Sequence, residues 1–249
     1  MNESMEFVVK TDVGMRRTIN EDRVEVFVSE NERVLAVIAD GMGGHNAGDV
    51  ASQMAISEIE KYFHAYNPSI ENAKDWLMHT FQSINQSIAK HSSITVGCEG
   101  MGTTLIAGLF EANKGIIAHI GDSRVYQITQ SFVQQITRDH TFVNVLIDSG
   151  EISEEQAKTH PMKNAIMKAV GTEQTIQPDF IEVDFPENSY FLFCSDGLSN
   201  KISESFIQST LYSDKPLHIK GEILVEEANN SGGEDNISLI LLSNNDKEV

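Results

Sequence analysis

Residues 34–41 read Val-Leu-Ala-Val-Ile-Ala-Asp-Gly, an apolar run that stops at Asp40. A short apolar run rich in β-branched residues is typical of a strand that is buried on both faces. The run 190–197, Tyr-Phe-Leu-Phe-Cys-Ser-Asp-Gly, has the same form and stops at Asp196. A third apolar run, 116–122, ends in Gly-Asp. The sequence therefore predicts buried strands that each carry an aspartate at their end.

Other acidic residues stand directly before apolar runs. Glu21 and Asp22 precede the run 23–28, and Asp235 precedes the run 237–242. If neighbouring strands run antiparallel, the end of one lies beside the start of the next. Carboxylates that follow strands and carboxylates that precede strands then gather at one rim of the sheets.

Such a gathering of like charges needs compensation. Two carboxylates ~4 Å apart repel by roughly 4 kcal/mol at an effective dielectric constant near 20, and several such pairs exceed the ~5–15 kcal/mol stability of a typical domain. The carboxylates are therefore spread out, protonated or bound to cations. A single Asp-Gly after a strand is usually just a turn, but the repeated placement favours a metal site. An all-oxygen cluster favours Mg²⁺ or Mn²⁺ over zinc.

The order of predicted elements favours an α+β fold. Two long helical patterns at 50–63 and 73–88 are separated by Pro68, and further helices are expected at 142–148, after Ser153, at 203–212 and at 217–229. Strands are expected between these helices without βαβ alternation, which indicates antiparallel sheets with helix pairs packed outside them. No repeat or low-complexity tract divides the chain, so we expect one domain over residues 1–249. The expected strands are 7–9, 23–28, 34–39, 103–110, 115–120, 125–129, 132–136, 180–184, 190–195 and 237–242.

The charge of the chain excludes some classes of partner. Lys and Arg number 18 against 37 Asp and Glu, for a net charge of -19, so a broad nucleic-acid-binding surface is not expected. No apolar segment is long enough to span a membrane. The two cysteines, Cys98 and Cys194, fit a reducing compartment without disulfides. We therefore expect a cytoplasmic protein. The glycines of 41–44 lack the Lys-Ser/Thr pair of a phosphate-binding P-loop.

Six short motifs occur in a fixed order, and together they resemble a known family. Over about residues 6–242, the chain is similar to the PPM-type (type 2C) metal-dependent Ser/Thr protein phosphatases in their compact bacterial form. The motifs are Arg17-x-x-x-Glu21-Asp22, Asp40-Gly41-Met42-Gly43-Gly44, Gly100-Met101-Gly102-Thr103-Thr104, Gly121-Asp122-Ser123-Arg124, Ser195-Asp196-Gly197 and Gly233-Glu234-Asp235-Asn236.

The resemblance implies an architecture and a set of metal ligands. The fold would be a four-layer αββα sandwich, with two antiparallel sheets flanked by helix pairs and a two-metal centre at one end. An insert at about 141–163 would form a mobile flap beside the active site. Carried over by position, Asp40 bridges both metals, Asp196 and Asp235 hold the first, Glu21 and the carbonyl of Gly41 hold the second, Asp22 orients its waters, and Asp122 with Asp196 supports a third, weaker ion.

The resemblance also implies how phosphate is gripped, and it leaves the proton donor open. Arg17 would bind the substrate phosphate. Animal members carry His directly after the Asp-Gly of the second motif, whereas this chain has Met42. His45 and His160 are both candidates for the general acid, and each is equally compatible with a surface or packing role. His119 lies within an apolar run, and we expect it to be a core residue with satisfied hydrogen bonds.

The activity implied is hydrolysis of phosphoserine and phosphothreonine in proteins by water activated by Mn²⁺ or Mg²⁺, without a covalent phosphoenzyme. By analogy with the family, the partners would be a bacterial Ser/Thr protein kinase and its substrates. Two alternatives stay open: a pseudophosphatase that binds phosphoproteins without turnover, and a hydrolase of small phosphate esters that uses the same centre. The intact acidic set argues against the pseudophosphatase.

Overall fold

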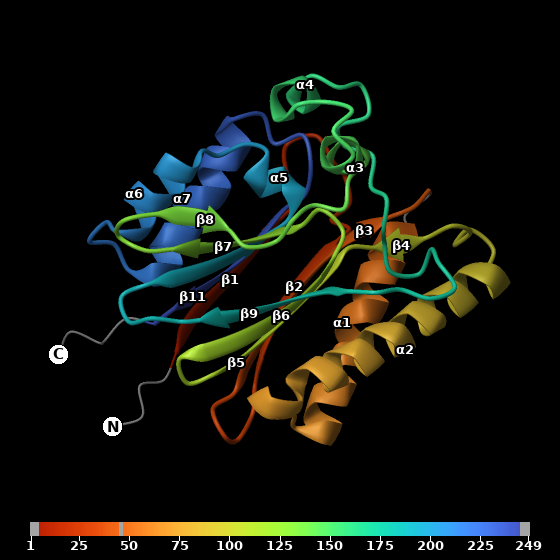
Figure 1. Ribbon diagram of the computed structural model, residues 1–249, viewed down its shortest axis with the longest axis horizontal. Helices are drawn as coiled ribbons and strands as arrows, with labels where there is room; N and C mark the ends of the chain where they lie inside the picture. The colour runs from red at the N-terminus through yellow and green to blue at the C-terminus, as the bar shows by residue number, and fades with distance from the viewer. Residues whose placement is uncertain (1–4, 45–46, 245–249) are drawn as a thin grey trace.

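The structure is a computed structural model that describes residues 5–44 and 47–244. Two antiparallel sheets lie face to face (Figure 1). The first has the order β1-β11-β10-β7-β8, with β1 (Glu6–Asp12), β11 (Ile237–Ser243), β10 (Tyr190–Cys194), β7 (Arg124–Ile128) and β8 (Val133–Gln135). The second has the order β2-β3-β5-β6-β9, with β2 (Asp22–Val28), β3 (Val34–Met42), β5 (Leu105–Glu111), β6 (Lys114–Ile120) and β9 (Asp179–Asp184), while the short β4 (Gly102–Thr103) pairs with the end of β3.

Helices cover the outer faces of both sheets. The second sheet is covered by α1 (Ala47–Tyr66) and α2 (Ala73–Ile94). The 3-10 turn η1 (Ile70–Asn72) lies between these two helices and directly precedes α2. The first sheet is covered by α6 (Glu204–Leu211) and α7 (Leu217–Asn230). At the top of Figure 1, α3 (Phe142–Asp148) and α4 (Glu154–Lys158) project beyond the sheets. The four-layer sandwich expected from the resemblance is therefore confirmed.

Three apolar layers hold these elements together. The layer between the sheets is filled by large side chains, among them Phe110, Phe191 and Phe193, which are fully buried. The two outer layers lie between each sheet and its helices. Burial at roughly 25 cal/mol per Å² of apolar surface makes these layers the main source of stability. No helix in the described ranges is both long and apolar enough to cross a membrane.

The register of the strands brings the acidic ends to one rim. Asp22, at the start of β2, lies opposite Asp40 near the end of β3. In the other sheet, β10 pairs antiparallel with β11, and the amide of Ser195 donates to the carbonyl of Ser238 at 3.1 Å. The end of β10 therefore meets the start of β11, as the antiparallel prediction requires.

Two local features differ from the expectation. The expected strand 103–110 is divided into β4 and β5, because β4 turns to pair with the end of β3. The short helix α5 (Asp196–Ser199) was not expected at all. It is too short to show helical periodicity, and its Ser-Asp-Gly start is equally typical of a turn.

Candidate active site

Asp40 is held by backbone hydrogen bonds from the segment after β4. Its amide donates to the hydroxyl of Thr104 at 2.9 Å, and its carbonyl accepts from the hydroxyl of Thr103 at 2.9 Å and from the amide of Thr104 at 2.8 Å. Both backbone polar groups of Asp40 are thereby satisfied at the point where β3 leaves the core. The two threonines fix the direction in which the Asp40 side chain leaves the strand.

Asp22 lies at the junction of the two sheets. Only 1% of its surface is exposed, and its Oδ2 accepts a hydrogen bond from the hydroxyl of Ser195 at 2.7 Å. That hydroxyl also accepts from the amide of Ser238 at 3.1 Å. Ser195 therefore connects a carboxylate of one sheet to the backbone of the other, and it ties the two halves of the site together.

Glu21 and Gly41 lie against the start of α1. A Cβ on Gly41 would come within 2.0 Å of the carbonyl oxygen of Gly48, so a larger residue would push α1 away. A Cβ on Gly48 would lie 2.7 Å from Oε1 of Glu21, which places this carboxylate above the helix start. The amide of Glu21 donates to the side chain of Asn236 at 2.8 Å. The glycine pair therefore lets the Glu21 carboxylate and the Gly41 backbone lie side by side.

Asp196 and Asp235 meet where α5 begins. A Cβ on Gly197 would lie 2.0 Å from the carbonyl oxygen of Asn236 and 3.3 Å from Cβ of Asp235, so this contact requires glycine. Asn200 donates to Oδ2 of Asp196 at 3.2 Å. Arg17 forms an ion pair with Asp235 at 2.9 Å. Arg17 is thus placed at the rim of the acidic cluster.

Asp122 completes the cluster from the end of β6. It is 7% exposed, and its Oδ1 is buried without a hydrogen-bond partner among the described residues. Its neighbour Ser123 shares a hydrogen bond of 2.8 Å with the hydroxyl of Thr104, which also binds the backbone of Asp40. A buried carboxylate oxygen without a partner is costly unless a cation or water reaches it.

These carboxylates lie close enough to one another to disfavour each other's charge. Burial raises the pKa of Asp40 well above its ordinary value, and the charges of Asp22, Asp196, Asp122 and Asp235 raise it further. Burial also raises the pKa of Asp22 to about 6, against opposing hydrogen bonds from serines, and that of Asp122 to about 7. The pKa of Asp196 is raised by burial and then by Asp235. These groups disfavour one another's charge across five chain segments.

These residues fit divalent cations. The donors are carboxylate and carbonyl oxygens, which Mg²⁺ and Mn²⁺ prefer. Bound cations would remove the mutual repulsion that raises the pKa values, and one would reach the unpartnered Oδ1 of Asp122. Both cysteines are free and buried, and Cys194 lies within β10.

Of the two histidine candidates for the general acid, the structure describes only His160. His45 lies outside the described residues. The ring of His160 packs 5.9 Å from that of Phe142, and its Nδ1 accepts from the amide of Met162 at 3.1 Å. His160 therefore packs within the flap region.

His119 is buried as expected, but its ring nitrogens are poorly hydrogen-bonded. Among the described residues neither nitrogen has a partner at ordinary hydrogen-bond geometry, although the backbone of Gly121 and Ser123 lies near the ring. Burial, together with His140, lowers the pKa of His119 to about 3. Its ring instead stacks on His140 with centroids 4.7 Å apart. Stacking on a neighbouring ring was not readable from the apolar run that surrounds His119.

His119, His140 and Asp179 form a second cluster, with ligand-type atoms within 4.8 Å of one another. The Nδ1 of His140 accepts from the amide of Gly121 at 3.1 Å, so the proton lies on Nε2, which faces Asp179 at 3.1 Å. Both ring nitrogens of His140 are therefore engaged in hydrogen bonds. Because the rings of His119 and His140 are stacked, the nitrogen lone pairs, which lie in the ring planes, do not point toward one shared metal position. We interpret the cluster as hydrogen-bonded support for the segment that enters the flap.

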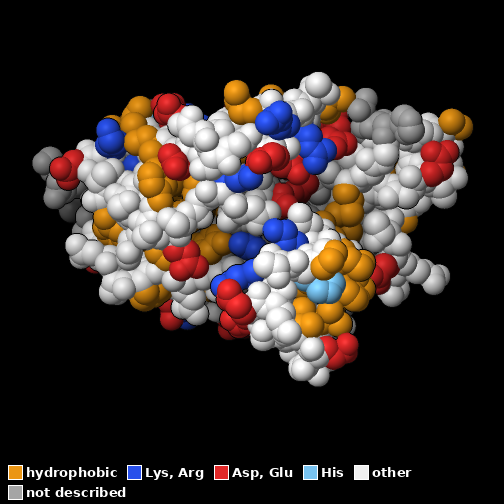
Figure 2. Space-filling view, turned by 90° about the horizontal axis from the view of Figure 1, so that it is seen from above, with side chains coloured by type: hydrophobic (Ala, Val, Ile, Leu, Met, Phe, Trp, Pro, Cys, Tyr) orange, Lys and Arg blue, Asp and Glu red, His pale blue; other side chains and the backbone are white. Residues whose placement is uncertain are grey.

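A cleft of about 880 Å³ opens beside the acidic cluster. One wall is formed by α3, α4 and the residues that follow them, and the other by α5 with Glu234 and Asp235. Figure 2, which looks down on this end of the molecule, shows basic and acidic side chains gathered near the middle of the face. The cleft is large enough for an extended peptide segment to reach Asp196 and Asp235.

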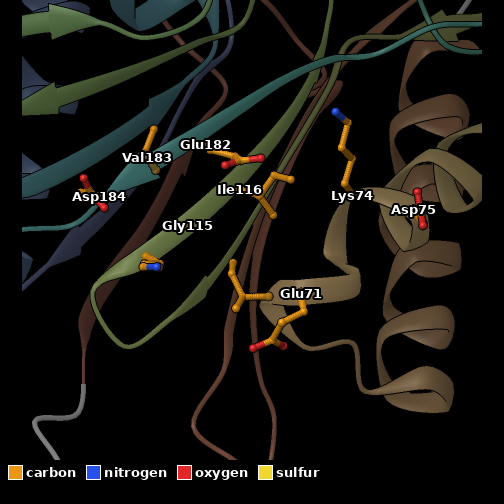
Figure 3. Close-up of a pocket in the computed structure, with 10 residues that line it drawn as sticks. Glu71, Lys74, Asp75, Gly115, Ile116, Glu182, Val183 and Asp184 are labelled. Carbon is orange, nitrogen blue, oxygen red and sulfur yellow. The ribbon is translucent and has the colours of Figure 1, made fainter.

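Another hollow, of about 580 Å³, lies between the start of α2 and the strands β6 and β9 (Figure 3). Glu71, Lys74 and Asp75 line its helical side, and Glu182 and Asp184 come from β9. None of the carboxylates of the acidic cluster lines it. We assign it no part in the chemistry.

Several residues that position the carboxylates were not singled out from the sequence for that role. Thr103, Thr104, Ser195 and Asn236 each bind the backbone or the carboxylate of an acidic residue. All four residues lie inside the motifs quoted above, and membership in these motifs was the one sign in the sequence that they could have such a role. Their partners are distant in sequence, and a sequence alone does not show such pairs.

Comparison with known proteins matches this geometry to one family. The family model described as "Protein phosphatase 2C" matches residues 15–216. The chain is 40% identical over 246 residues to "Protein phosphatase PhpP" of Streptococcus pneumoniae, covering 98% of this chain and 100% of that protein. Among solved structures, the S. agalactiae serine/threonine phosphatase has a TM-score of 0.90 at 33% identity, covering 96% and 99% of the two chains. The catalytic domain of PstP in complex with two manganese ions has a TM-score of 0.83 at 33% identity, covering 97% and 99%.

Proposed function

Because this chain belongs to the protein phosphatase 2C family and is a serine/threonine protein phosphatase, we propose that its acidic cluster holds two Mn²⁺ or Mg²⁺ ions, with room for a third, weaker one. The observation that carries the proposal is the convergence of acidic residues at one rim of the sheets, where Asp22 lies opposite Asp40. The charges of Asp22, Asp196, Asp122 and Asp235 all raise the pKa of Asp40. The PstP structure with manganese supports the choice of metal.

Each acidic residue then has a defined task. Asp40, Asp196 and Asp235 would hold the first ion, and Asp40 would be shared with the second. Glu21 and the carbonyl of Gly41 would hold the second ion, and Asp22 would orient water beside it. Asp122, whose Oδ1 has no partner among the described residues, would support the third ion together with Asp196. When bound, such ions would lower the pKa of a water molecule so that hydroxide is present at neutral pH to attack phosphorus in line, and they would neutralise charge on the phosphoryl oxygens.

Arg17 is the residue of this chain that we assign to the substrate phosphate. Its guanidinium lies at the rim of the cluster beside Asp235, and its side chain is 49% exposed. The planar fork of an arginine can bind two phosphoryl oxygens at once. Arg17 would therefore leave its ion pair with Asp235, bind the phosphoryl group and orient it toward the acidic cluster. His45 stays a proposal for the general acid.

The proposed substrates are phosphoserine and phosphothreonine proteins in the cytoplasm, with a Ser/Thr protein kinase and its targets as partners. The flap of the single domain, at about 141–163, forms one wall of the cleft that these substrates enter. The net charge of -19 repels phosphorylated ligands at long range, but salt screens this beyond ~10 Å. Local cations therefore recruit the phosphate.

A metal titration of phosphopeptide hydrolysis tests the proposal. The purified protein should hydrolyse a phosphothreonine peptide when Mn²⁺ is added and should stop with excess EDTA. Full activity in EDTA, or none with any divalent metal, would refute it. Binding of the peptide without turnover would instead identify a pseudophosphatase. A higher kcat/KM for small phosphate esters than for phosphoproteins would identify a hydrolase of small metabolites.

A further inference from the structure

The cleft beside the acidic cluster holds more positive charge than the chain as a whole. Its lining has five cations and five carboxylates, whereas the whole chain has 18 Lys and Arg against 37 Asp and Glu. Figure 2 shows Lys and Arg side chains close together in the middle of this face. The cations that line the cleft are Arg124, Arg138, Lys158, Lys163 and Lys201.

One of these cations has a structural task. Arg124 donates to both carboxylate oxygens of Asp139, at 2.7 to 3.1 Å, and the two side chains are 24% and 11% exposed. This bidentate, half-buried pair joins β7 to the segment that enters the flap. Arg124 is therefore unavailable to a ligand.

The cations on the flap side are available. Lys163 is exposed and has no ion-pair partner among the described residues. Arg138 pairs with Asp148, but the two side chains are 54% and 64% exposed. An exposed pair of this kind contributes little to stability. A carboxylate or phosphate of a ligand can therefore replace Asp148 at little cost.

The carboxylates of the cleft are mostly engaged. Asp196 and Asp235 belong to the acidic cluster, Asp139 is bound by Arg124, and Glu234 pairs with Lys201, which leaves Glu154. If cations neutralise the acidic cluster, the remaining charged side chains of the lining are Arg138, Lys158 and Lys163 against Glu154, a net positive set. A ligand segment that carries negative charge would therefore be complementary to this surface.

We propose that this phosphatase selects phosphorylated segments that carry acidic residues, Asp, Glu or a second phosphoresidue, a few positions from the scissile phosphate. Lys163 and Arg138 bind these flanking charges while the phosphoryl group lies at the acidic cluster. The proposal rests on the proposed phosphatase function and adds the substrate preference of the same site. Specificity thus comes from exposed flap cations, and the chemistry comes from buried carboxylates.

Matched phosphothreonine peptides test the preference in the unmodified protein. Three peptides of equal length differ only in their flanks, which carry Glu, Ala or Lys, and p-nitrophenyl phosphate serves as a substrate without flanks. With Mn²⁺, the kcat/KM for the Glu peptide should exceed that for the Ala peptide by roughly tenfold, and the Lys peptide should be the poorest. The preference should shrink in 0.5 M NaCl, because the Debye length falls from about 10 Å at 0.1 M salt to about 3 Å at 1 M, and exposed charges farther apart than this length are screened.

Variants locate the preference. Lys163→Ala and Arg138→Ala should each reduce the ratio of kcat/KM for the Glu and Ala peptides by roughly two- to fivefold, and the double variant by more. Lys90→Ala, an exposed lysine of α2 outside the cleft, is the matched control and should keep the wild-type ratio.

The possible outcomes distinguish a failure of the acidic preference from a failure of the proposed phosphatase function. If neither p-nitrophenyl phosphate nor any peptide is hydrolysed with Mn²⁺, the proposed function itself fails. If all three peptides are hydrolysed with equal kcat/KM, the function stands and the acidic preference is refuted. The preference is assigned to the wrong residues if the double variant keeps the wild-type ratio.

Discussion

The acidic cluster and the flap cleft lie side by side, but they are built in opposite ways. Asp22 and Asp40 sit on paired strands between packed sheets, and threonine and serine hydroxyls fix their backbones or carboxylates. Arg138 and Lys158 of the flap side sit in exposed ion pairs with neighbours close in sequence. Buried charges in a low-dielectric pocket interact strongly, whereas exposed charges interact weakly and are screened by salt. Changes in the first region should therefore have large effects, and changes in the second should have small ones.

The largest effect is expected from Asp40→Asn. The change removes the carboxylate shared by both proposed ions, so phosphopeptide hydrolysis should fall by at least roughly 10³-fold. The metal-free variant should be no less stable to heat than the wild type, because it loses a carboxylate that its neighbours repel. Steady-state kinetics and thermal unfolding measure the two effects. Asp75→Asn, in the hollow of Figure 3, is the control. Near-normal turnover by the Asp40 variant would remove the metal assignment.

Ser195→Ala should have an intermediate effect. Without the hydroxyl, Asp22 loses a hydrogen bond that lowers its pKa, and the two sheets lose a link. Loss of a group that orients a metal ligand typically reduces metal affinity about 10- to 100-fold. The Mn²⁺ concentration for half-maximal activity should rise accordingly. Ser199→Ala is a matched control, because the buried hydroxyl of Ser199 has no partner among the described residues. Equal effects of the two variants would contradict the positioning role of Ser195.

The pH dependence of stability should reveal the same cluster. The pKa values of Asp22, about 6, and Asp122, about 7, lie above the ordinary value of 3.8. The folded, metal-free protein therefore holds protons that the unfolded chain has released between about pH 4 and 7. Its free energy of unfolding should fall as pH rises through this window, by up to about 1.4 kcal/mol per pH unit for each group.

Chemical denaturation at several pH values, with and without Mn²⁺, measures this dependence. Saturating Mn²⁺ should stabilise the protein more at pH 7.5 than at pH 5, since protons compete with the metal for the carboxylates. If stability of the metal-free protein rises between pH 5 and 7 instead, the carboxylates do not share a pocket.

The smallest effect is expected on the flap side. Asp148→Ala removes an exposed partner of Arg138 and should change the free energy of unfolding by less than about 1 kcal/mol. Thermal unfolding and activity on p-nitrophenyl phosphate should both stay near the wild-type values. A loss of several kcal/mol would show that the flap side is built as tightly as the acidic cluster, and the contrast between the two regions would then be wrong.

Much of this architecture was readable from the sequence, because apolar runs and their acidic ends are local patterns. The order of strands and helix pairs predicted antiparallel sheets with helices packed outside them, and a helix was expected after Ser153, where α4 begins. The pairing of Asp22 with Asp40 followed from antiparallel strands. The contacts of Thr104 and Ser195 did not, because their partners are 64 and 173 residues away. The stacking of His119 on His140 is likewise a product of the fold, since the two residues lie in separate segments of the chain.

Anomalous diffraction from crystals grown with Mn²⁺ tests the central claim most directly. The account predicts two strong manganese peaks flanking Asp40, one contacting Asp196 and Asp235 and the other contacting Glu21 and the carbonyl of Gly41. A third, weaker peak is expected beside Asp122. Crystals of protein that is active in the same Mn²⁺ buffer but shows no manganese peak near Asp40 would contradict the account.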